Sequence, residues 1–192
     1  VGPYTATDGR GANDTSTLAL QVSAMDDPVT DGNETRTVAE DSVANTGNVL
    51  ANASSVDGAV SVASFQVGGT TYLAGQTATL AGGTLTIAAD GTYSFTPAAD
   101  WTGALPVVSY TVTDGSGTDD TSTLRLAVSP VNDDFTDADE TRTVAEDSGT
   151  STGNVLTGTS SVDGPVSVVS FQVGGSTYLA GQAATLAGGA LT

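Results

Sequence analysis

The sequence predicts an all-β protein built from two-sheet sandwiches that are repeated in tandem. Three observations support this prediction: stretches of sequence return at a fixed distance, short segments alternate apolar and polar residues, and turn residues recur between them. TRTVAEDS begins at Thr35 and again at Thr141, and SFQVGG begins at Ser64 and again at Ser170, so both are offset by 141 − 35 = 106 residues. A period of this length implies that the repeating unit is a whole domain.

The period divides the 192 residues into one complete repeat and two partial ones. We expect the complete repeat at 28–133, the C-terminal end of a preceding repeat at 1–27, and the N-terminal half of the next repeat at 134–192. About a hundred residues can bury a core without disulfides, and the chain has no Cys. Partial sandwiches leave strand edges bare, so we expect them to be disordered or completed by another copy of the chain.

Within the complete repeat we expect seven or eight short strands. Thr35–Ala39 is the first of them. Val60–Val67 and Thr70–Leu73 flank the pair Gly68-Gly69, which is a strong signal for a two-residue hairpin turn.

The second half of the repeat shows the two-residue alternation of a half-buried strand most clearly. A strand containing Leu85 and Ile87 is followed by an Asp90-Gly91 turn. Three further strands are marked by alternate apolar residues: Tyr93 and Phe95; Val108, Tyr110 and Val112; Leu124, Leu126 and Val128. One buried and one solvated face per strand is what a two-sheet sandwich requires, and no stretch of helical period appears. The pattern therefore predicts an immunoglobulin-like β-sandwich.

Composition excludes several functional classes. The chain carries 22 acidic residues and four Arg, with no Lys, His or Cys, for a net charge of −18. This charge argues against a nucleic-acid partner and against an anionic membrane surface. No apolar run is long enough to insert into a bilayer. Without His, Cys or Lys, no Ser–His–Asp relay, Cys–His pair, Schiff-base lysine or His-ligated zinc can form, so we expect no enzymatic activity.

The single Trp and the repeated Tyr are better explained by packing than by chemistry. Trp101 stands in AADWTGALP between two strands. It could be a stacking platform for a ligand, but a plug at one end of the core is the favoured interpretation. Tyr4 and Tyr110 begin equivalent strands, and we expect each ring to pack in the core with its hydroxyl bonded to the backbone.

Acidic residues gather in the turn before the last strand and around the proposed junctions between repeats. The end of one repeat's last strand must face the start of the next repeat, so acids from both sides meet there. Unpaired carboxylates repel one another unless a cation joins them, and numerous hard oxygen ligands select Ca²⁺. Solvated turn residues that merely keep the chain soluble are the competing interpretation. The predicted metal ligands are Asp8, Asp26, Asp27, Glu40, Asp41, Asp114, Asn132, Asp133, Asp134, Glu146 and Asp147.

These motifs carry a family resemblance. In order, VAEDS, GNVLAN, ADGTYSFTP, YTVTDG and PVNDD resemble the tandem immunoglobulin-like or cadherin-like repeats, often called VCBS-type, of large RTX-type bacterial adhesins. The resemblance covers the whole chain and implies an end-to-end β-sandwich array with Ca²⁺ at the linkers. The family's acid-rich NDxDxDG loop is here reduced to Asp57, whereas the acids at the linker and strand ends match.

The sequence therefore predicts a structural extender, or stalk, of a secreted bacterial surface adhesin. Its partners would be neighbouring repeats of the same chain, joined by Ca²⁺ at each junction, in support of adhesion and biofilm formation on the outer cell surface. The alternative is an adhesive module of the same fold that binds carbohydrate or protein through the loop near Trp101.

Overall fold

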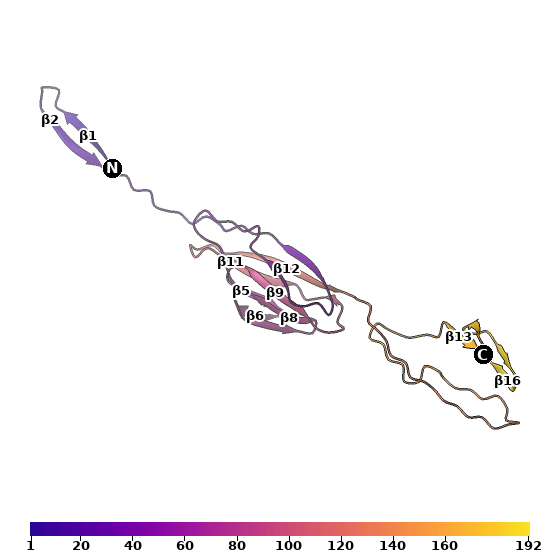
Figure 1. The fold of residues 1–192 in the computed structure, drawn as a ribbon. Helices are drawn as coiled ribbons and strands as arrows, with labels where there is room; N and C mark the ends of the chain where they lie inside the picture. The colour runs from indigo at the N-terminus through magenta and orange to yellow at the C-terminus, as the bar shows by residue number, and fades with distance from the viewer.

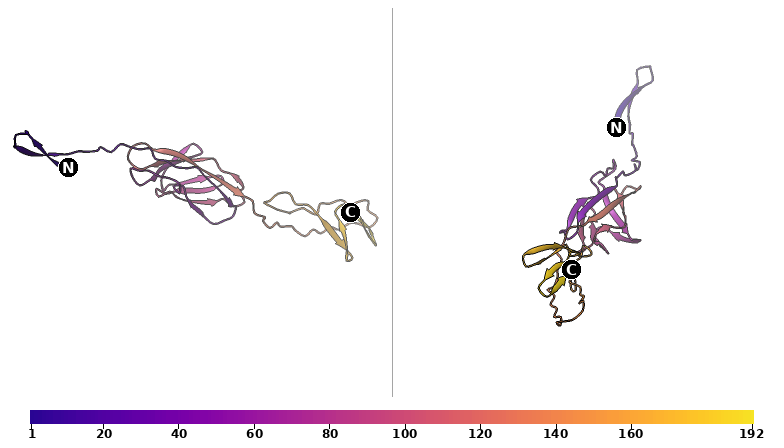
Figure 2. Two further views of the ribbon diagram at one scale, coloured as in Figure 1. Left: turned by 90° about the horizontal axis from the view of Figure 1, so that it is seen from above. Right: turned by 90° about the vertical axis from the view of Figure 1, so that its right-hand side faces the viewer.

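The computed structural model describes all 192 residues, and its regular structure consists of sixteen β-strands and no helix. An N-terminal hairpin, a central sandwich and a C-terminal part follow one another along an elongated molecule, with the chain ends in the outer two parts (Figure 1). The two further views show the same succession (Figure 2). The predicted all-β class is thus confirmed.

One sheet of the central sandwich has six strands. Its hydrogen-bonded order is β10-β12-β11-β5-β6, with β3 also paired to β12. The strands are β3 (Glu34–Ala39), β5 (Ser61–Val67), β6 (Thr70–Leu73), β10 (Gly103–Ala104), β11 (Val108–Thr113) and β12 (Asp120–Ser129). The β3–β12 pair is parallel, and every other pair in the sheet is antiparallel. Because the first and last strands point the same way, the chain enters the sandwich at one end and leaves it at the other.

The second sheet has four antiparallel strands in the order β4-β9-β8-β7. They are β4 (Asn45–Asn48), β7 (Thr77–Leu80), β8 (Gly83–Ile87) and β9 (Thr92–Pro97). The Asp90-Gly91 turn joins β8 to β9 as predicted, and the Asp90 carboxylate accepts a hydrogen bond from the Thr92 N–H at 2.9 Å.

The core lies between the two sheets and follows the predicted alternation. In β11 and β12 the six apolar residues named from the sequence are all buried, and the residues between them are not. Phe65 of β5 and Phe95 of β9 are 1% and 0% exposed, so each sheet supplies a large ring to the core. Trp101 packs against this core, and a Cβ on Gly82 would lie 2.6 Å from its ring. Its predicted role as a packing residue is confirmed.

The strand count is higher than predicted, ten in place of seven or eight, because three strands lack an apolar signature. β4 reads NTGN, and β10 has only two residues. β7 reads TATL, in which Ala78 alone is buried. In β4 the absence of a side chain on Gly47 makes room for the ring of Tyr93, whose atoms would lie 2.6 Å from a Cβ there. Pairing with neighbours, rather than alternation, places these strands.

The outer parts of the chain form isolated hairpins. The pairs are β1 (Gly2–Thr7) with β2 (Asn13–Leu18), β13 (Ser170–Val173) with β14 (Ser176–Leu179), and β15 (Ala184–Leu186) with β16 (Gly189–Leu191). Phe171 and Tyr178 stack at 5.4 Å between ring centroids, as Phe65 and Tyr72 do at 5.2 Å in the central sandwich. Local sequence therefore forms the same hairpins in both copies. Completion of the partial repeats by another copy of the chain stays a prediction.

Candidate metal centre

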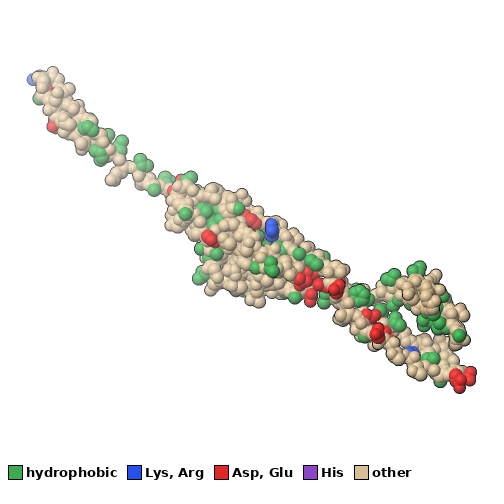
Figure 3. Space-filling view, in the orientation of Figure 1, with side chains coloured by type: hydrophobic (Ala, Val, Ile, Leu, Met, Phe, Trp, Pro, Cys, Tyr) green, Lys and Arg blue, Asp and Glu red, His purple; other side chains and the backbone are tan.

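Acidic side chains gather where the central sandwich gives way to the C-terminal part of the chain (Figure 3). Two groups of three carboxylates occur there, Glu40 with Asp133 and Asp163, and Asp41 with Asp100 and Asp133. Within each group, one oxygen from each residue lies within 4.8 Å of the others. Because Asp133 belongs to both groups, the five residues form one unit, which we call the junction cluster.

Glu40 is the buried member of the junction cluster, with 4% of its surface exposed. It follows β3 directly, and its N–H donates to the Ser129 carbonyl at 3.0 Å, which continues the pairing of β3 with β12. Its carboxylate accepts a hydrogen bond from the Val131 N–H at 2.7 Å. Glu40 therefore joins the end of the first strand to the segment that leaves the last strand.

Asp41 and Asp100 approach the cluster from two turns with unusual backbone geometry. Their φ angles are 56° and 54°, in the left-handed region that Asp tolerates better than most residues. The Asp100 N–H donates to the Asp41 carboxylate at 3.2 Å, so each turn holds the other. Asp100 also precedes Trp101, whose packing against the core anchors this loop.

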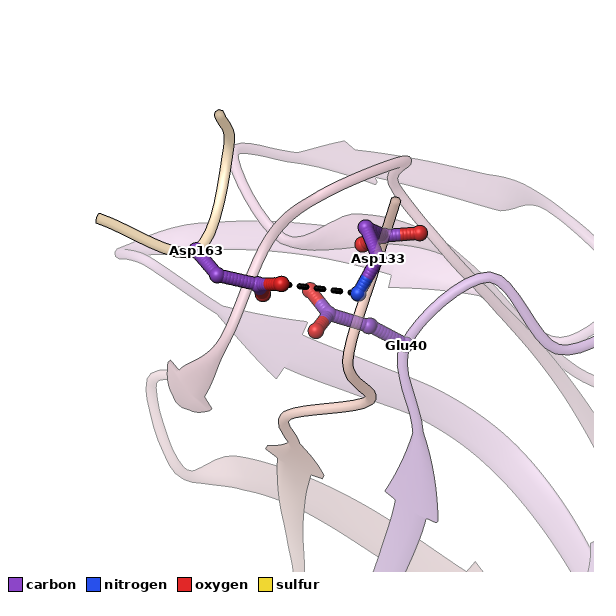
Figure 4. A group of neighbouring side chains, drawn as sticks. All are labelled: Glu40, Asp133 and Asp163. Carbon is purple, nitrogen blue, oxygen red and sulfur yellow. Dashed lines mark hydrogen bonds between the residues drawn. The ribbon is translucent and has the colours of Figure 1, made fainter. Parts of the chain in front are cut away.

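Asp133 and Asp163 belong to the part of the chain that follows β12. The Asp133 N–H donates to Asp163 Oδ2 at 2.7 Å, and Glu40 lies beside this pair (Figure 4). The same contact occurs one period earlier, where the Asp27 N–H donates to Asp57 Oδ2 at 2.6 Å. The two contacts are separated by 133 − 27 = 106 residues, so the contact is part of the repeat.

The junction cluster carries uncompensated negative charge. Burial raises the pKa of the Asp133 carboxyl, and the charges of Asp41, Asp163, Asp100 and Glu40 raise it further. Asp133 Oδ2 is buried and has no hydrogen-bond partner. A buried oxygen without a donor, surrounded by four other carboxylates, suits a divalent cation that takes six to eight oxygen ligands. These residues therefore fit Ca²⁺ by their donor chemistry.

Three other predicted ligands lie at the opposite end of the sandwich, where the chain enters. The Asp26 carboxylate accepts hydrogen bonds from the N–H and the hydroxyl of Thr118, at 3.0 and 2.7 Å. Asp27 makes the contact with Asp57 described above. The Asp114 carboxylate accepts from the Ser55 hydroxyl and from the Ser116 N–H, and these two bonds hold its pKa below the usual range.

The remaining predicted ligands stand apart from any group of three carboxylates. Asp8 caps the β1–β2 turn by accepting from the Arg10 and Ala12 N–H groups. Asn132 and Asp134 flank Asp133 but do not belong to the junction cluster. Two more lie in the C-terminal part and are exposed, namely Glu146 and Asp147, the equivalents of Glu40 and Asp41 one period later.

The structure brings together Glu40, Asp41 and Asp133 from the predicted set and adds Asp100 and Asp163, which sequence reasoning missed. Asp163 carried a usable signal, because it is the equivalent of Asp57, the one carboxylate left in the family's acid-rich loop. Asp100 carried none, since only the folded path of the β9–β10 loop brings it to Asp41.

A two-sheet β-sandwich with carboxylates gathered where the chain leaves it is an architecture of the cadherin-like class. Comparison with known families agrees: the model of the bacterial cadherin-like domain matches residues 25–130. The chain belongs to this family, and the matched segment is 130 − 25 + 1 = 106 residues long, the length of the repeat period. No curated protein matches the chain significantly.

Family membership narrows the function. Bacterial cadherin-like domains are structural and adhesive rather than catalytic, and they suggest an extracellular, adhesin-like repeat. No helix in the structure is long and apolar enough to cross a membrane. Domains of this kind generally bind Ca²⁺, and the junction cluster is a group of acids able to hold it.

Replacing Asp133 with Asn should weaken Ca²⁺ binding at the junction by at least about tenfold, the lower end of the losses seen when a metal site loses even an outer partner. The reason is that Asp133 is shared by both carboxylate groups. Isothermal titration of the full chain measures the effect. Asp134→Asn is the matched control, since it removes the same charge one residue away, outside the cluster. Equal losses in both variants would mean that only net charge matters.

Proposed function

We propose that this chain is part of a calcium-stiffened stalk of a bacterial surface adhesin, with residues 1–27, 28–133 and 134–192 belonging to three successive repeats. The observation that carries the proposal is the junction cluster. Its ligands come from both sides of the connection: Glu40, Asp41 and Asp100 from the central sandwich, and Asp163 from the following repeat. Asp133 lies in the connecting segment between them.

Such a cluster makes stiffness depend on the cation. Without a cation, the carboxylates in each group of the junction cluster repel one another, and this repulsion pushes the two repeats apart where Asp163 approaches Glu40 and Asp133. A bound Ca²⁺ converts this repulsion into shared coordination and fixes the angle between repeats. Extracellular calcium modules typically have dissociation constants of about 0.1–1 mM. The stalk would therefore be rigid at extracellular calcium concentrations and flexible where calcium is scarce.

The architecture of the sandwich suits a spacer. Parallel first and last strands carry the chain from one end of the domain to the other, so each repeat adds its full length to the array. The stalk would hold an adhesive region away from the cell surface, in support of attachment and biofilm formation. The packing of Trp101 against the core gives no support to the alternative of a ligand platform at that residue.

Calcium should narrow the distribution of distances between successive repeats. Thr70 and Ser176 are exposed, equivalent positions in the two repeats, and the absence of native Cys allows both to be replaced by Cys and spin-labelled cleanly. We expect one narrow distance peak with about 5 mM Ca²⁺, well above the dissociation constants typical of such modules. A broad distribution should appear with a chelator.

The control for this experiment is the same labelled pair in a chain carrying both Asp133→Asn and Asp163→Asn, which should give a broad distribution at any calcium concentration. Mg²⁺ at the same concentration is the control for ionic strength and charge screening, and it should leave the distance distribution broad. A wild-type distribution that does not change on adding chelator would overturn calcium stiffening. A change that persists in the double variant would place the responsible cation elsewhere.

A further inference from the structure

A second group of acids lies at the other end of the central sandwich, within a single repeat. Asp31 stands just before β3, Glu34 is the first residue of β3, and Asp120 is the first residue of β12. The Asp31 N–H donates to Asp120 Oδ2 at 3.0 Å, which links the starts of the two parallel strands. We call Asp31, Glu34 and Asp120, with the hydroxyl of Tyr110, the inner site. The six residues of β3, about 20 Å of strand, separate it from the junction cluster.

Three carboxylate oxygens of the inner site are buried without a partner: both of Asp31 and Oε1 of Glu34 each expose less than 1 Å² and accept no hydrogen bond. The chain's four arginines therefore donate nothing to them. A buried, unpaired carboxylate is costly, because the water it has lost is not replaced by any donor. The fold thus holds three buried carboxylate oxygens together with no hydrogen-bond donor or positive charge to balance them.

The Tyr110 hydroxyl also has too few hydrogens for the acceptors around it. Its ring is 1% exposed, and its hydroxyl lies 3.0 Å from the Gly32 carbonyl and 3.1 Å from the Val49 carbonyl, with Glu34 Oε2 in contact as well. One hydroxyl hydrogen can serve only one of these three acceptors. Burial raises the pKa of this phenol, and its hydrogen bond to Glu34 and the charges of Glu34 and Asp31 raise it further, so it cannot ionise to relieve the conflict.

A proton on Glu34 would not resolve the arrangement. Burial and the neighbouring Asp31 raise the pKa of Glu34, so protonation there is the obvious alternative. A single added hydrogen would satisfy one contact to Tyr110 and still leave both Asp31 oxygens without a partner. A cation that accepts several oxygens at once satisfies Asp31 and Glu34 together.

We propose that Asp31 and Glu34 bind a divalent cation of the calcium type inside each repeat, at the start of β3. The ligands would be the three unpartnered oxygens, with water completing the shell. This site is separate from the junction cluster and acts within one repeat: it would hold the start of β3 in the conformation in which Asp31 contacts Asp120 of β12 and Glu34 contacts Tyr110 of β11. The required residue types recur one period away, at Asp137 and Glu140 in the next repeat and at Tyr4 and Asp14 in the preceding one.

The test compares Ca²⁺ binding by full chains that differ at single acids. Asp31→Asn should remove one bound Ca²⁺ per complete repeat and reduce the Ca²⁺-induced rise in the melting temperature of the central sandwich, followed through Trp101, to the part that the junction cluster supplies. Asp119→Asn is the matched control, because Asp119 is an exposed acid beside Asp120 and outside the inner site. It should behave as wild type. Equal stoichiometry in wild type and Asp31→Asn, or equal losses in Asp31→Asn and Asp119→Asn, would overturn the proposal.

A second measurement covers the case in which Asp31→Asn fails to fold. The Asp133→Asn chain has a weakened junction cluster and an intact inner site, so it should still bind Ca²⁺ and gain melting temperature from it. Tb³⁺ bound to this variant should show luminescence excited through tyrosine, because Tyr110 borders the inner site. An Asp133→Asn chain that binds neither ion and gains no stability would overturn the proposal of a cation at the inner site.

Discussion

Replacing Gly83 with alanine should destabilise the central sandwich by about 3 kcal/mol or more, as the sum of backbone strain and a steric clash. Gly83 begins β8 with φ at +139°, a region that residues with a side chain rarely adopt. A Cβ at this position would lie 2.1 Å from the Thr96 carbonyl oxygen and 2.9 Å from Pro97 Cα. Both neighbours are backbone atoms of β9, so no side chain can rotate away to make room.

Thermal unfolding followed by Trp101 fluorescence measures the loss, because the only Trp reports on the central sandwich alone. We expect the melting temperature to fall by roughly 12 °C or more, from about 4 °C per kcal/mol for a domain of this size. Gly189→Ala is the matched control. Gly189 is the equivalent residue one period later, with φ at +150° and no neighbouring atom within 4 Å of a Cβ. A similar melting temperature for Gly83→Ala and wild type would contradict the close approach of β8 and β9.

The sequence predicted the sandwich well for two reasons. The alternation of apolar and polar residues is visible within each strand, and the 106-residue period gives the length of the repeating unit directly. The strands around Tyr110 and Leu124 have one apolar face that admits only one burial pattern, and Gly68-Gly69 has φ angles of +58° and +81°, as a two-residue hairpin turn requires. The parallel pairing of β3 with β12 was not predictable in this way. It depends on a contact between residues about 90 positions apart, which leaves no local pattern.

The candidate metal centre was predictable only in part, for a physical reason. Acids on the chain leaving a strand, such as Glu40 and Asp133, can be placed at the end of the sandwich from strand direction alone. Asp100 reaches the same place through a turn whose path depends on the packing of Trp101. Asp26 and Asp114 also lie in acid-rich loops next to strands, as the residues of the junction cluster do. Backbone N–H groups and hydroxyls donate to their carboxylates, however, so they need no cation. Sequence cannot distinguish a carboxylate that caps a turn from one that faces other carboxylates.

The central sandwich should resist force applied through the chain ends more strongly than force applied across its β5–β6 hairpin. Tension on the ends pulls β3 and β12, which are parallel and paired over six positions from Glu34–Leu124 to Ala39–Ser129. Their hydrogen bonds are therefore loaded in shear and must yield together. Attachment at Cys residues introduced at Ser64 and Leu73 instead opens the antiparallel β5–β6 pair one bond at a time, starting from the open end of that hairpin. Single-molecule pulling on the full chain measures both forces.

Arg36→Pro tests which contact bears the load. The Glu40 N–H donates to Ser129 of β12, and backbone direction alternates along a strand, so the N–H of Arg36, which lies opposite Leu126, also faces β12. Proline at this exposed position removes that N–H and fixes φ, so the ladder loses a bond near its centre. We expect the unfolding rate at a given force along the chain to rise by about tenfold or more, from about 1.5 kcal/mol lost with one ladder bond. Thr70→Pro is the control, because it removes an N–H from the β5–β6 hairpin, and β6 is an edge strand outside the path of the load. An equal mechanical loss in both variants would show that force resistance follows overall stability, whereas a loss confined to Arg36→Pro identifies the parallel pair as the mechanical element of the stalk.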